Sequence, residues 1–458
     1  MNTSSRGDTA HQSKSGQSRS GGRSQSNNQG HNRSRRRDRG GSGRGGHSAH
    51  SGAQKNVVRP TSKGSPAIVL KQNLVVHSCT SSSFSGLESY VLDLVTWQHQ
   101  KRRAVLLFCR EGTPLHRMAV EKGVPVYTIG PKDKSGPRLW ASLRKFWAEK
   151  LKVGNVTLHM HAGGEPWYHL PWLWKTKSIL QYHIWINHKK NDPLHRVLFS
   201  AIGEVWTSSE SARNHLLKLL PVRPERLRVV PYGRDIETMS LAPRSVWRRD
   251  VRRALNIGER DTLILSVARL EPLKGVRELF EAFLKIESQF PHAHLAIVGA
   301  PSPHDESAER LAHELKIKWT ALPESLKARI HLPGHVSPVL PFFAAADMYV
   351  VASHEECFSL AMIDAAAFGL PIIGTRSGGT PSLVHHDETG LLVEPKSVDA
   401  LADGLTKLLK HPRMARLFGD EGKKRSNKFD REQIYQSMLQ HYAARAVPVV
   451  ALPHAAAK

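Results

Sequence analysis

A chain of 458 residues, 40% of them hydrophobic, is long enough for two globular domains, so a single small domain is excluded. The formal net charge of +26 favours anionic partners such as nucleic acid, anionic lipid or phosphorylated glycans, without selecting among them. Cys79, Cys109 and Cys357 are too few for a closed disulfide framework and lack the spacing of a metal site. This cysteine usage predicts a reducing compartment.

The N-terminal segment, residues 1–65, consists mainly of Ser, Gly, Gln, Asn, His and Arg and is predicted to be a disordered basic tail. Residues 1–63 contain 13 Lys or Arg and two Asp, which gives +11 of the net +26. The cluster RSRRRDR at Arg33–Arg39 suits contact with RNA or a membrane. The alternative is a tail that only keeps the chain in solution.

No secretory signal is visible at the N-terminus, and no apolar run reaches the about 18 residues that a membrane span requires. We therefore expect a cytoplasmic protein, or a peripheral one on the inner face of the cytoplasmic membrane.

Short runs rich in β-branched residues alternate with helical segments from about Ser65 onwards. The expected strands are LVVHSC (Leu74–Cys79), AVLLFC (Ala104–Cys109), VPVYTIG, VTLHMH, SILQYHI, EVWTSS and LRVVPYG, with one helix near Thr113–Lys122. This alternation predicts a parallel sheet with helices on both faces.

The segment Pro137–Lys152 predicts a basic amphipathic helix. Its apolar residues recur at helical spacing: Leu139, Trp140, Leu143, Phe146, Trp147 and Leu151. Such a helix docks its apolar stripe on its own sheet, or it lies in a membrane interface. The aromatic residues Trp167, Tyr168, Trp172 and Trp174 keep the second interpretation open.

The alternation weakens between Arg234 and Glu259, which is polar and rich in Arg, and we place an interdomain boundary there. It restarts with the expected strands TLILSVAR, LAIVGA, RIHLPG, MYVVAS, PIIGT and GLLVEP. From Ser397 to about Arg445 the chain is expected to be mainly helical, with a break at Pro412.

The predicted fold is therefore α/β, with two Rossmann-like doubly wound domains that face each other across a cleft. The expected domains are residues 66–240 and 241–430, followed by a C-terminal helix and short tail, residues 431–458, with the helix crossing back to the first domain. Ligands of such sheets bind outside the carboxyl ends of the strands.

The stretch HEECFSLAMID (His354–Asp364) places the carboxylates of Glu356 and Asp364 in an apolar context, where burial without a partner is costly. We expect a turn followed by a helix that Gly369 closes. The free N–H groups of residues 358–360 would then attract an anion such as phosphate. Carboxylates beside that anion suit hydroxyl groups, and a nucleotide diphosphate sugar has this layout.

Cations for the diphosphate are expected from SVARLEPLKGV, where Arg269 and Lys274 follow a strand. Positive side chains can stabilise a departing diphosphate as a metal does elsewhere. No DxD-like acidic cluster is seen, so we predict no divalent metal and no cofactor. The alternative is a solvated pair of loop cations.

These motifs resemble those of the retaining GT-B glycosyltransferases of family 4, the group 1 glycosyltransferases. The similarity is most specific in SVARLEPLKG, RIHLPGHV, ASHEECFSLAMIDAAAFGLPIIGTRSGGTPSLV and ETGLLVEP. SGLESYVLDL and VVPYGRD resemble the family's glycine loop and strand-end signature more loosely. The resemblance covers about Val69 to Arg445.

By this resemblance, Glu356 and Asp364 occupy the ends of the family's E-x7-E motif. Glu356 would contact a hydroxyl of the donor sugar and Asp364 the ribose diol, while Arg269 and Lys274 would hold the diphosphate. The backbone amides of the turn and the close approach of a glycine would complete the donor site: Phe358, Ser359, Leu360 and Gly86. Asp364 replaces the usual Glu and is shorter by one methylene, which loosens the expected ribose contact. Cys357 and Ser359 replace common glycines, so the geometry of the turn is an open point.

His161, at the end of VTLHMH, is where the family often places a histidine near the transferred sugar. The alternative is a histidine held in a hydrogen-bond network at the strand end. His183 and His188, in a basic loop, are expected on the acceptor side.

The expected function is transfer of a hexose-type sugar from a nucleotide diphosphate sugar to an acceptor hydroxyl with retention. A glycan or glycolipid acceptor of envelope, lipopolysaccharide or polysaccharide synthesis is expected, with an anionic membrane surface as a further partner. The alternatives are a nucleotide-sugar epimerase or hydrolase on the same fold, and a polyanion-binding protein acting through its tail. A glycosidase would use paired carboxylates but leaves the phosphate-directed cations without a purpose, and binding of nucleic acid is not favoured.

Overall fold

The computed structural model describes residues 73–130, 136–152, 154–303 and 305–444. The chain divides into two units, residues 1–67 and 68–458. The predicted basic tail, with the Arg33–Arg39 cluster, lies outside the described residues, as does the end of the chain from residue 445. Within the described ranges, none of the helices combines the length and the apolar character needed to cross a bilayer.

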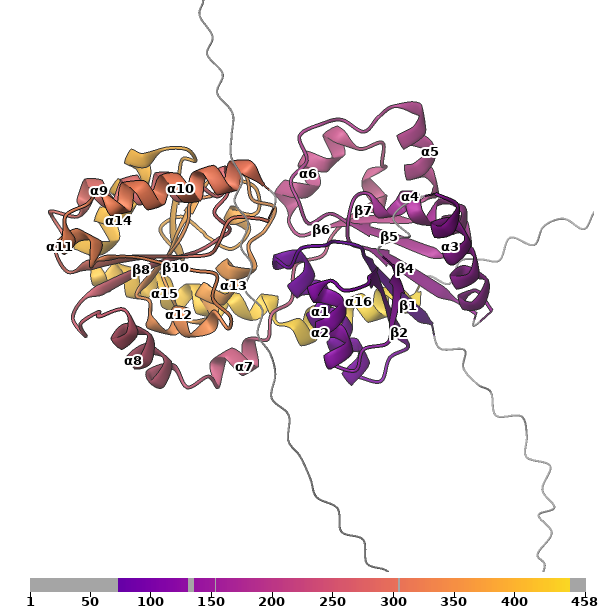
Figure 1. Ribbon diagram of the computed structural model, residues 1–458, viewed down its shortest axis with the longest axis horizontal. Helices are drawn as coiled ribbons and strands as arrows, with labels where there is room; N and C mark the ends of the chain where they lie inside the picture. Colours follow the sequence, from indigo (N-terminus) through magenta and orange to yellow (C-terminus); the bar gives the residue numbers. More distant parts are fainter. Residues whose placement is uncertain (1–72, 131–135, 153, 304, 445–458) are drawn as a thin grey trace, which may run out of the picture. The chain divides into compact units, whose positions relative to one another are not determined.

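A first parallel sheet is formed by the N-terminal half, in the order β3-β2-β1-β4-β5-β6-β7 (Figure 1). Its strands are β1 (Leu74–Cys79), β2 (Val105–Arg110), β3 (Val126–Ile129), β4 (Val156–Met160), β5 (Lys177–Gln181), β6 (Glu204–Thr207) and β7 (Leu227–Val229). Its helices are α1 (Gly86–Gln100), α2 (Pro114–Glu121), α3 (Pro137–Lys150), α4 (Glu165–His169), α5 (Pro193–Ala201) and α6 (Glu210–Leu219). Strand β1 has the predicted bounds, and β2 begins one residue later than expected.

The basic amphipathic helix α3 uses its apolar stripe against its own sheet. Leu139, Leu143, Phe146 and Trp147 are buried in one core cluster with residues of β2 and β4. Trp140 stays 45% exposed. These contacts match the interpretation in which the helix packs its apolar stripe on its own sheet. The residues that would enter a membrane interface are already buried in the core.

A second parallel sheet follows, which includes the labelled strands β8 and β10 (Figure 1). Its strands lie in the order β10-β9-β8-β11-β12-β13. Its strands are β8 (Thr262–Val267), β9 (Ala293–Val298), β10 (Ile330–Gly334), β11 (Met348–Val351), β12 (Ile372–Thr375) and β13 (Gly390–Val393). The helices of this half are α7 (Ile236–Ser240), α8 (Arg244–Ala254), α9 (Val276–Ile286), α10 (Glu306–Thr320), α11 (Glu324–Lys327), α12 (Leu340–Ala345) and α13 (Leu360–Ala367). Two parallel α/β sheets confirm the predicted fold class.

The predicted helix ends are found in this half. Gly369, with φ +78°, follows the last residues of α13, a conformation that glycine adopts without strain. A break at His411 separates α14 (Val398–Lys410) from α15 (Pro412–Ser426), so the expected interruption at Pro412 is confirmed.

All three cysteines are free and buried.

The last described helix, α16 (Arg431–Ala444), contacts the first sheet. The Tyr442 hydroxyl lies 2.8 Å from Nδ1 of His159 on β4, and the Lys177 ammonium of β5 donates to the Tyr442 carbonyl at 3.0 Å. Just before α16 the chain pairs with the segment that follows β7. The amide of Arg234 donates to the Phe429 carbonyl and the amide of Arg431 to the Arg234 carbonyl, both at 2.8 Å.

Candidate functional site

Each sheet has one point where the strand order reverses, between β1 and β4 in the first and between β8 and β11 in the second. In doubly wound sheets, ligands bind at the carboxyl ends of the strands at such a point. The loop after β8 carries Arg269 and Lys274, and the turn after β11 carries Glu356. The topology thus gathers the residues singled out for the diphosphate and the sugar at one edge of the second sheet.

The turn that presents Glu356 is packed against glycines from two other loops. Gly275 has φ +63°, and a Cβ there would lie 2.0 Å from the carbonyl oxygen of Ala352. Gly378 has φ +48°, and a Cβ there would lie 1.7 Å from the carbonyl oxygen of Glu356. The amide of Gly379 donates to that same carbonyl at 2.8 Å. The backbone of the turn is therefore fixed by loops that admit no side chain.

We expect Gly378→Ala to damage the turn, because the new Cβ meets both a left-handed backbone and the Glu356 carbonyl. Gly112→Ala is the matched control, since Gly112 has φ +74° but a Cβ there would meet no atom within 4 Å. The left-handed conformation alone costs about 1–2 kcal/mol. Thermal unfolding should show a clearly larger loss of stability for Gly378→Ala than for Gly112→Ala. Equal losses of stability would mean that the turn can shift to make room for the new Cβ.

The Glu356 carboxylate forms an ion pair with Lys274. Its Oε2 lies 2.7 Å from the Lys274 ammonium and also accepts from the Ser353 hydroxyl at 3.1 Å. Glu356 is 8% exposed, and the Lys274 side chain is 21% exposed. An ammonium has three N–H donors, so Lys274 can hold Glu356 and still donate to phosphate oxygens.

Arg269 is placed differently from Lys274. It is exposed, and its guanidinium lies 2.5 Å from Glu271 and 2.9 Å from the Ser302 hydroxyl. The Arg269 side chain is 47% exposed, so a phosphate can reach its guanidinium, whereas Glu271 is only 14% exposed and also accepts from the Ser302 hydroxyl. The structure brings Lys274 to Glu356, whereas the contacts of Arg269 are with its own loop and the one after β9.

The N-terminus of α13 follows the turn directly. Ser359 is its N-cap residue, and the side chain makes no capping hydrogen bond, so the first amides of the helix are available to an anion. Phe358 is buried, and Leu360 lies beside Gly86 of α1, where a Cβ would be 3.9 Å from Leu360 Cδ1. Cys357 and Ser359, the two departures from glycine, both keep a negative φ. These substitutions therefore introduce no backbone strain.

Asp364 is paired with Arg234, a residue that lies in the VVPYGRD segment and at the expected interdomain boundary but was not predicted as its partner. Its two carboxylate oxygens accept from the Arg234 guanidinium at 2.6 and 2.8 Å. Asp364 is 3% exposed. Burial raises the pKa of Asp364, and the charge of Arg234 opposes that rise. A ribose diol would have to share these oxygens with Arg234 or accept from the guanidinium itself.

His161 lies in a hydrogen-bond network at the end of β4, the second of its two expected settings. Its Nε2 is 3.0 Å from Nδ1 of His77, and its Nδ1 is 3.2 Å from Nε2 of His183. His183 also bonds the Tyr232 hydroxyl at 2.9 Å. Burial lowers the pKa of His161 well below its usual range, so the ring is neutral. Both ring nitrogens are engaged, whereas His188 is exposed.

Glu165 is a second residue that the sequence pattern did not indicate. Its carboxylate accepts from the amides of Thr80 at 2.6 Å, His161 at 2.9 Å and Ala162 at 3.3 Å, and so connects the loops after β1 and β4. Burial raises its pKa to about 7, although these amide donors act in the opposite direction. The preceding pair Gly163–Gly164 indicated a loop. No local pattern indicated that the Glu165 carboxylate would accept hydrogen bonds from the His161 and Ala162 amides of that loop.

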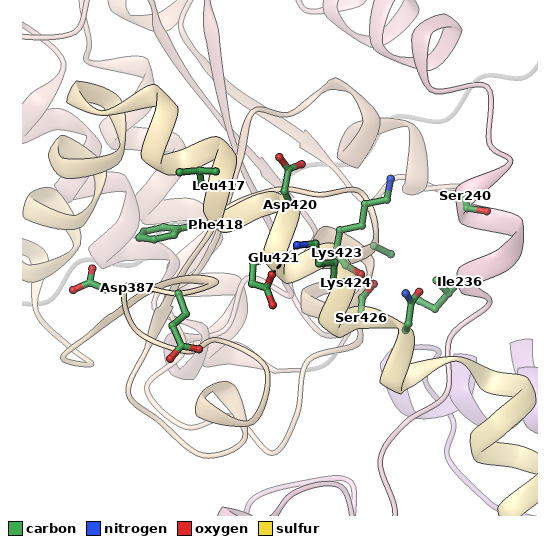
Figure 2. A pocket seen from close by; sticks show the side chains of 13 residues that line it. Ile236, Ser240, Asp387, Leu417, Phe418, Asp420, Glu421, Lys423, Lys424 and Ser426 are labelled. Carbon is green, nitrogen blue, oxygen red and sulfur yellow. Dashed lines mark hydrogen bonds and ion pairs between the residues drawn. The ribbon is translucent and has the colours of Figure 1, made fainter.

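A cavity of about 840 Å³ lies elsewhere, beside α15 and α7 (Figure 2). Charged side chains of α15 line it, among them Asp420, Glu421, Lys423 and Lys424. None of the predicted site residues lines this cavity. The charges of Lys424 and Glu421 in its lining partly neutralise each other, since the two side chains form an ion pair at 3.1 Å. We do not assign the donor to it.

Similarity to known proteins covers both halves of the chain. Residues 84–238 match the model of Glycosyltransferase Family 4, and residues 248–425 match that of Glycosyl transferases group 1. Among curated relatives, the D-inositol 3-phosphate glycosyltransferase of Corynebacterium glutamicum is 32% identical over 191 residues, 41% of this chain and 44% of the relative. A GDP-mannose-dependent alpha-(1-6)-phosphatidylinositol monomannoside mannosyltransferase of Mycobacterium tuberculosis is 31% identical over 183 residues, 40% of this chain and 46% of the relative. The matched region thus spans about half the length of these relatives.

Solved structures extend the similarity of fold to most of the chain. The structure of HepE from Anabaena in complex with UDP and glucose is 18% identical, with a TM-score of 0.69 over 82% of this chain and 100% of that chain. A glycosyltransferase from Rickettsia africae has a TM-score of 0.70 over 81% of this chain and 98% of that chain, at 18% identity. Together these comparisons show that the chain has the GT-B fold, with a first half similar to family 4 glycosyltransferases and a second half similar to group 1 glycosyl transferases.

Proposed function

We propose that the protein transfers a hexose-type sugar from a nucleotide diphosphate sugar to an acceptor hydroxyl, with retention of configuration. The observation that carries the proposal is the Lys274–Glu356 pair at 2.7 Å, set beside the uncapped N-terminus of α13 at the point of strand reversal. A cation and a row of amides suit a diphosphate, and a fixed carboxylate suits a sugar hydroxyl.

Charge stabilisation of the departing diphosphate is the main catalytic contribution in this proposal. Lys274, Arg269 and the amides of residues 358–360 face charge that develops on the leaving group, which is where fixed positive charge lowers a barrier. Gly86, the first residue of α1, lies beside Leu360, where an added Cβ would make an ordinary contact at 3.9 Å. No divalent metal is proposed at the donor, because these groups supply the positive charge themselves.

His161 acts through its position in this scheme, since its ring nitrogens are bonded to His77 and His183. Proton removal from the acceptor is assigned to the leaving phosphate, on the same face of the sugar. This assignment follows the resemblance to retaining GT-B enzymes.

The acceptor is proposed to be a glycan or glycolipid of the cell envelope. Support comes from the activities for which the relatives are named, which include a phosphatidylinositol monomannoside mannosyltransferase. Trp140 of the basic helix α3 and Trp174 are 45% and 58% exposed and are proposed as aromatic contacts for an anionic membrane. Flotation with anionic vesicles should exceed that with neutral vesicles, and equal flotation would remove the membrane from the proposal.

A screen of radiolabelled UDP-, GDP- and ADP-sugars tests the reaction itself. One donor should be consumed much faster when an acceptor glycolipid is present, and the product should keep the anomeric configuration of the donor by NMR. Isomerisation or hydrolysis at the same rate without acceptor would favour an epimerase or hydrolase. Binding of nucleic acid that is lost only on removal of residues 1–65, without turnover of any donor, would favour the polyanion-binding alternative.

A further inference from the structure

The loop after β5, residues 182–190, brings the ammonium of Lys190 to the end of β4. Nζ of Lys190 lies 3.7 Å from the position that a Cβ on Gly163 would occupy. Gly163 belongs to the loop that follows β4 and His161. Because β4 is one of the two strands at which the order of the first sheet reverses, Lys190 lies at the edge where doubly wound sheets bind ligands.

The same loop is held in place by its backbone. The amide of Lys190 donates to the Leu219 carbonyl at 2.9 Å. Nε2 of His215 lies 2.6 Å from the carbonyl oxygen of Ile186, in the middle of the loop. The Lys190 side chain therefore extends from a fixed backbone, which reduces the entropy lost when a ligand binds to it.

The loop also contacts the turn that carries Glu356. Nδ2 of Asn187 donates to the Glu355 carboxylate at 3.0 Å, and Sγ of Cys357 lies 4.0 Å from the Tyr182 carbonyl oxygen. Glu355 and Cys357 are the two neighbours of Glu356 in the sequence. A group bound to this loop would therefore lie near the carboxylate that is proposed to hold the donor sugar.

Two polar groups of this loop lack the partners that burial requires. Burial lowers the pKa of the half-buried Lys190, and in the described part of the chain no carboxylate forms an ion pair with it. Its ammonium lies over the Tyr182 ring, 5.7 Å from the ring centroid. Tyr182 is 3% exposed, and its hydroxyl has no hydrogen-bond partner among the described residues. An ammonium and a hydroxyl withdrawn from water without acceptors are costly, so this place favours an anion that accepts from donors here.

Building on the proposed transfer reaction, we infer that Lys190 binds a phosphate group of the acceptor, close to the hydroxyl that receives the sugar. An ammonium is a compact charge with three donors, which suits phosphate oxygens. The adjacent Lys189 is exposed and adds positive charge. Asp192, the next acidic residue along the chain, caps α5 and pairs with His195, so it leaves the charge of Lys190 available.

This subsite is separate from the cations proposed for the donor diphosphate. Lys274 pairs with Glu356, and Arg269 contacts Glu271, whereas Lys190 belongs to the first domain. The inference narrows the acceptor to a hydroxyl compound that carries a phosphate. A free sugar phosphate and the headgroup of a phospholipid share this chemistry, and they differ in whether the acceptor is dissolved or held in a lipid assembly.

Calorimetry with glucose 6-phosphate and glucose as probes tests the subsite in the full-length protein. The wild type should bind the phosphorylated probe about 10–100-fold more tightly, the range for a hydrogen bond to a charged group. Lys190→Met should abolish this preference, whereas Lys190→Arg and the control Lys189→Met should keep it. A preference that survives in Lys190→Met, that is lost equally in Lys189→Met, or that is lost only in Lys274→Met would overturn the inference.

Steady-state kinetics then identify the source of the phosphate. With the donor selected by the screen, glucose 6-phosphate and phosphatidylinositol in detergent micelles serve as acceptors. Lys190→Met should raise the acceptor KM about 10–100-fold and leave the donor KM unchanged. A rise for the micellar lipid alone indicates a headgroup, and a rise for the sugar phosphate alone indicates a dissolved acceptor. A change in the donor KM alone would contradict the inference.

The two proposals can fail separately. If the wild type consumes no donor with any acceptor, the transfer reaction is wrong, and the calorimetric preference for the phosphate is still measured. If transfer proceeds and neither probe shows dependence on Lys190, the reaction stands and the phosphate subsite is wrong.

Discussion

Glu356→Gln is expected to reduce glycosyl transfer by about 10²–10³-fold while the protein stays folded, the range found when one fixed polar group that stabilises a transition state is removed. Glutamine keeps the shape of the side chain but loses the charge that pairs with Lys274 at 2.7 Å. Lys274 would then lose its fixed orientation, and the sugar hydroxyl would lose its strongest acceptor. Both effects act on the same step.

The neighbouring Glu355 provides the control for this experiment. It precedes Glu356 in the same turn, but its carboxylate accepts from Asn187 at 3.0 Å, whereas the Lys274 ammonium pairs with Glu356. Steady-state rates should therefore be nearly unchanged in Glu355→Gln. Full turnover by Glu356→Gln, or an equal loss in both variants, would show that the site has been assigned to the wrong carboxylate.

Arg234→Leu is expected to destabilise the protein by about 3–5 kcal/mol, because it leaves Asp364 buried without its partner. The pair is bidentate, at 2.6 and 2.8 Å, and Asp364 is 3% exposed. Removal of the guanidinium would also raise the pKa of Asp364 further, so the loss should be smaller at acidic pH, where the carboxyl is protonated. Chemical unfolding at two pH values measures both effects.

A double variant separates the pair from the individual side chains. Arg234→Leu with Asp364→Leu removes both charges, and replacing a whole buried ion pair by apolar residues is often close to neutral. Most of the lost stability should therefore return. A single variant as stable as the wild type, or a double variant as damaged as the single one, would mean that burial of Asp364 does not depend on Arg234.

The two sheets could be predicted well from the sequence because parallel strands and their helices leave a local pattern. The β-branched run Leu74–Cys79 and the glycine after α13 are examples in which a few adjacent residues decide the structure. Lys274 and Glu356 could be expected together for a topological reason, since both follow strands at the same edge of a sheet.

Long-range pairing left no such pattern. Arg234 was part of the VVPYGRD segment and of the polar linker, but neither pattern indicated its partner Asp364, which lies 130 positions away in the sequence. The bond from the Thr80 amide to Glu165 was hidden as well, because it joins residues 85 positions apart. The partners of His77 and His159, Gln98 of α1 and Tyr442 of α16, also meet them only after the sheet has formed. The expected reach of Arg269 to the diphosphate stays a prediction, as do the domain boundaries.

The paired backbone at Arg234 has a mechanical consequence. The chain passes between the two halves twice, and both passages are tied by amide–carbonyl bonds of Arg234 with Phe429 and Arg431. A Cβ on Gly233 would lie 2.7 Å from Arg431 Cα, so the two strands of the joint touch. The Arg234–Asp364 ion pair ties this joint to α13, so the segment that links the two halves is held by the same helix whose first amides are proposed to face the donor.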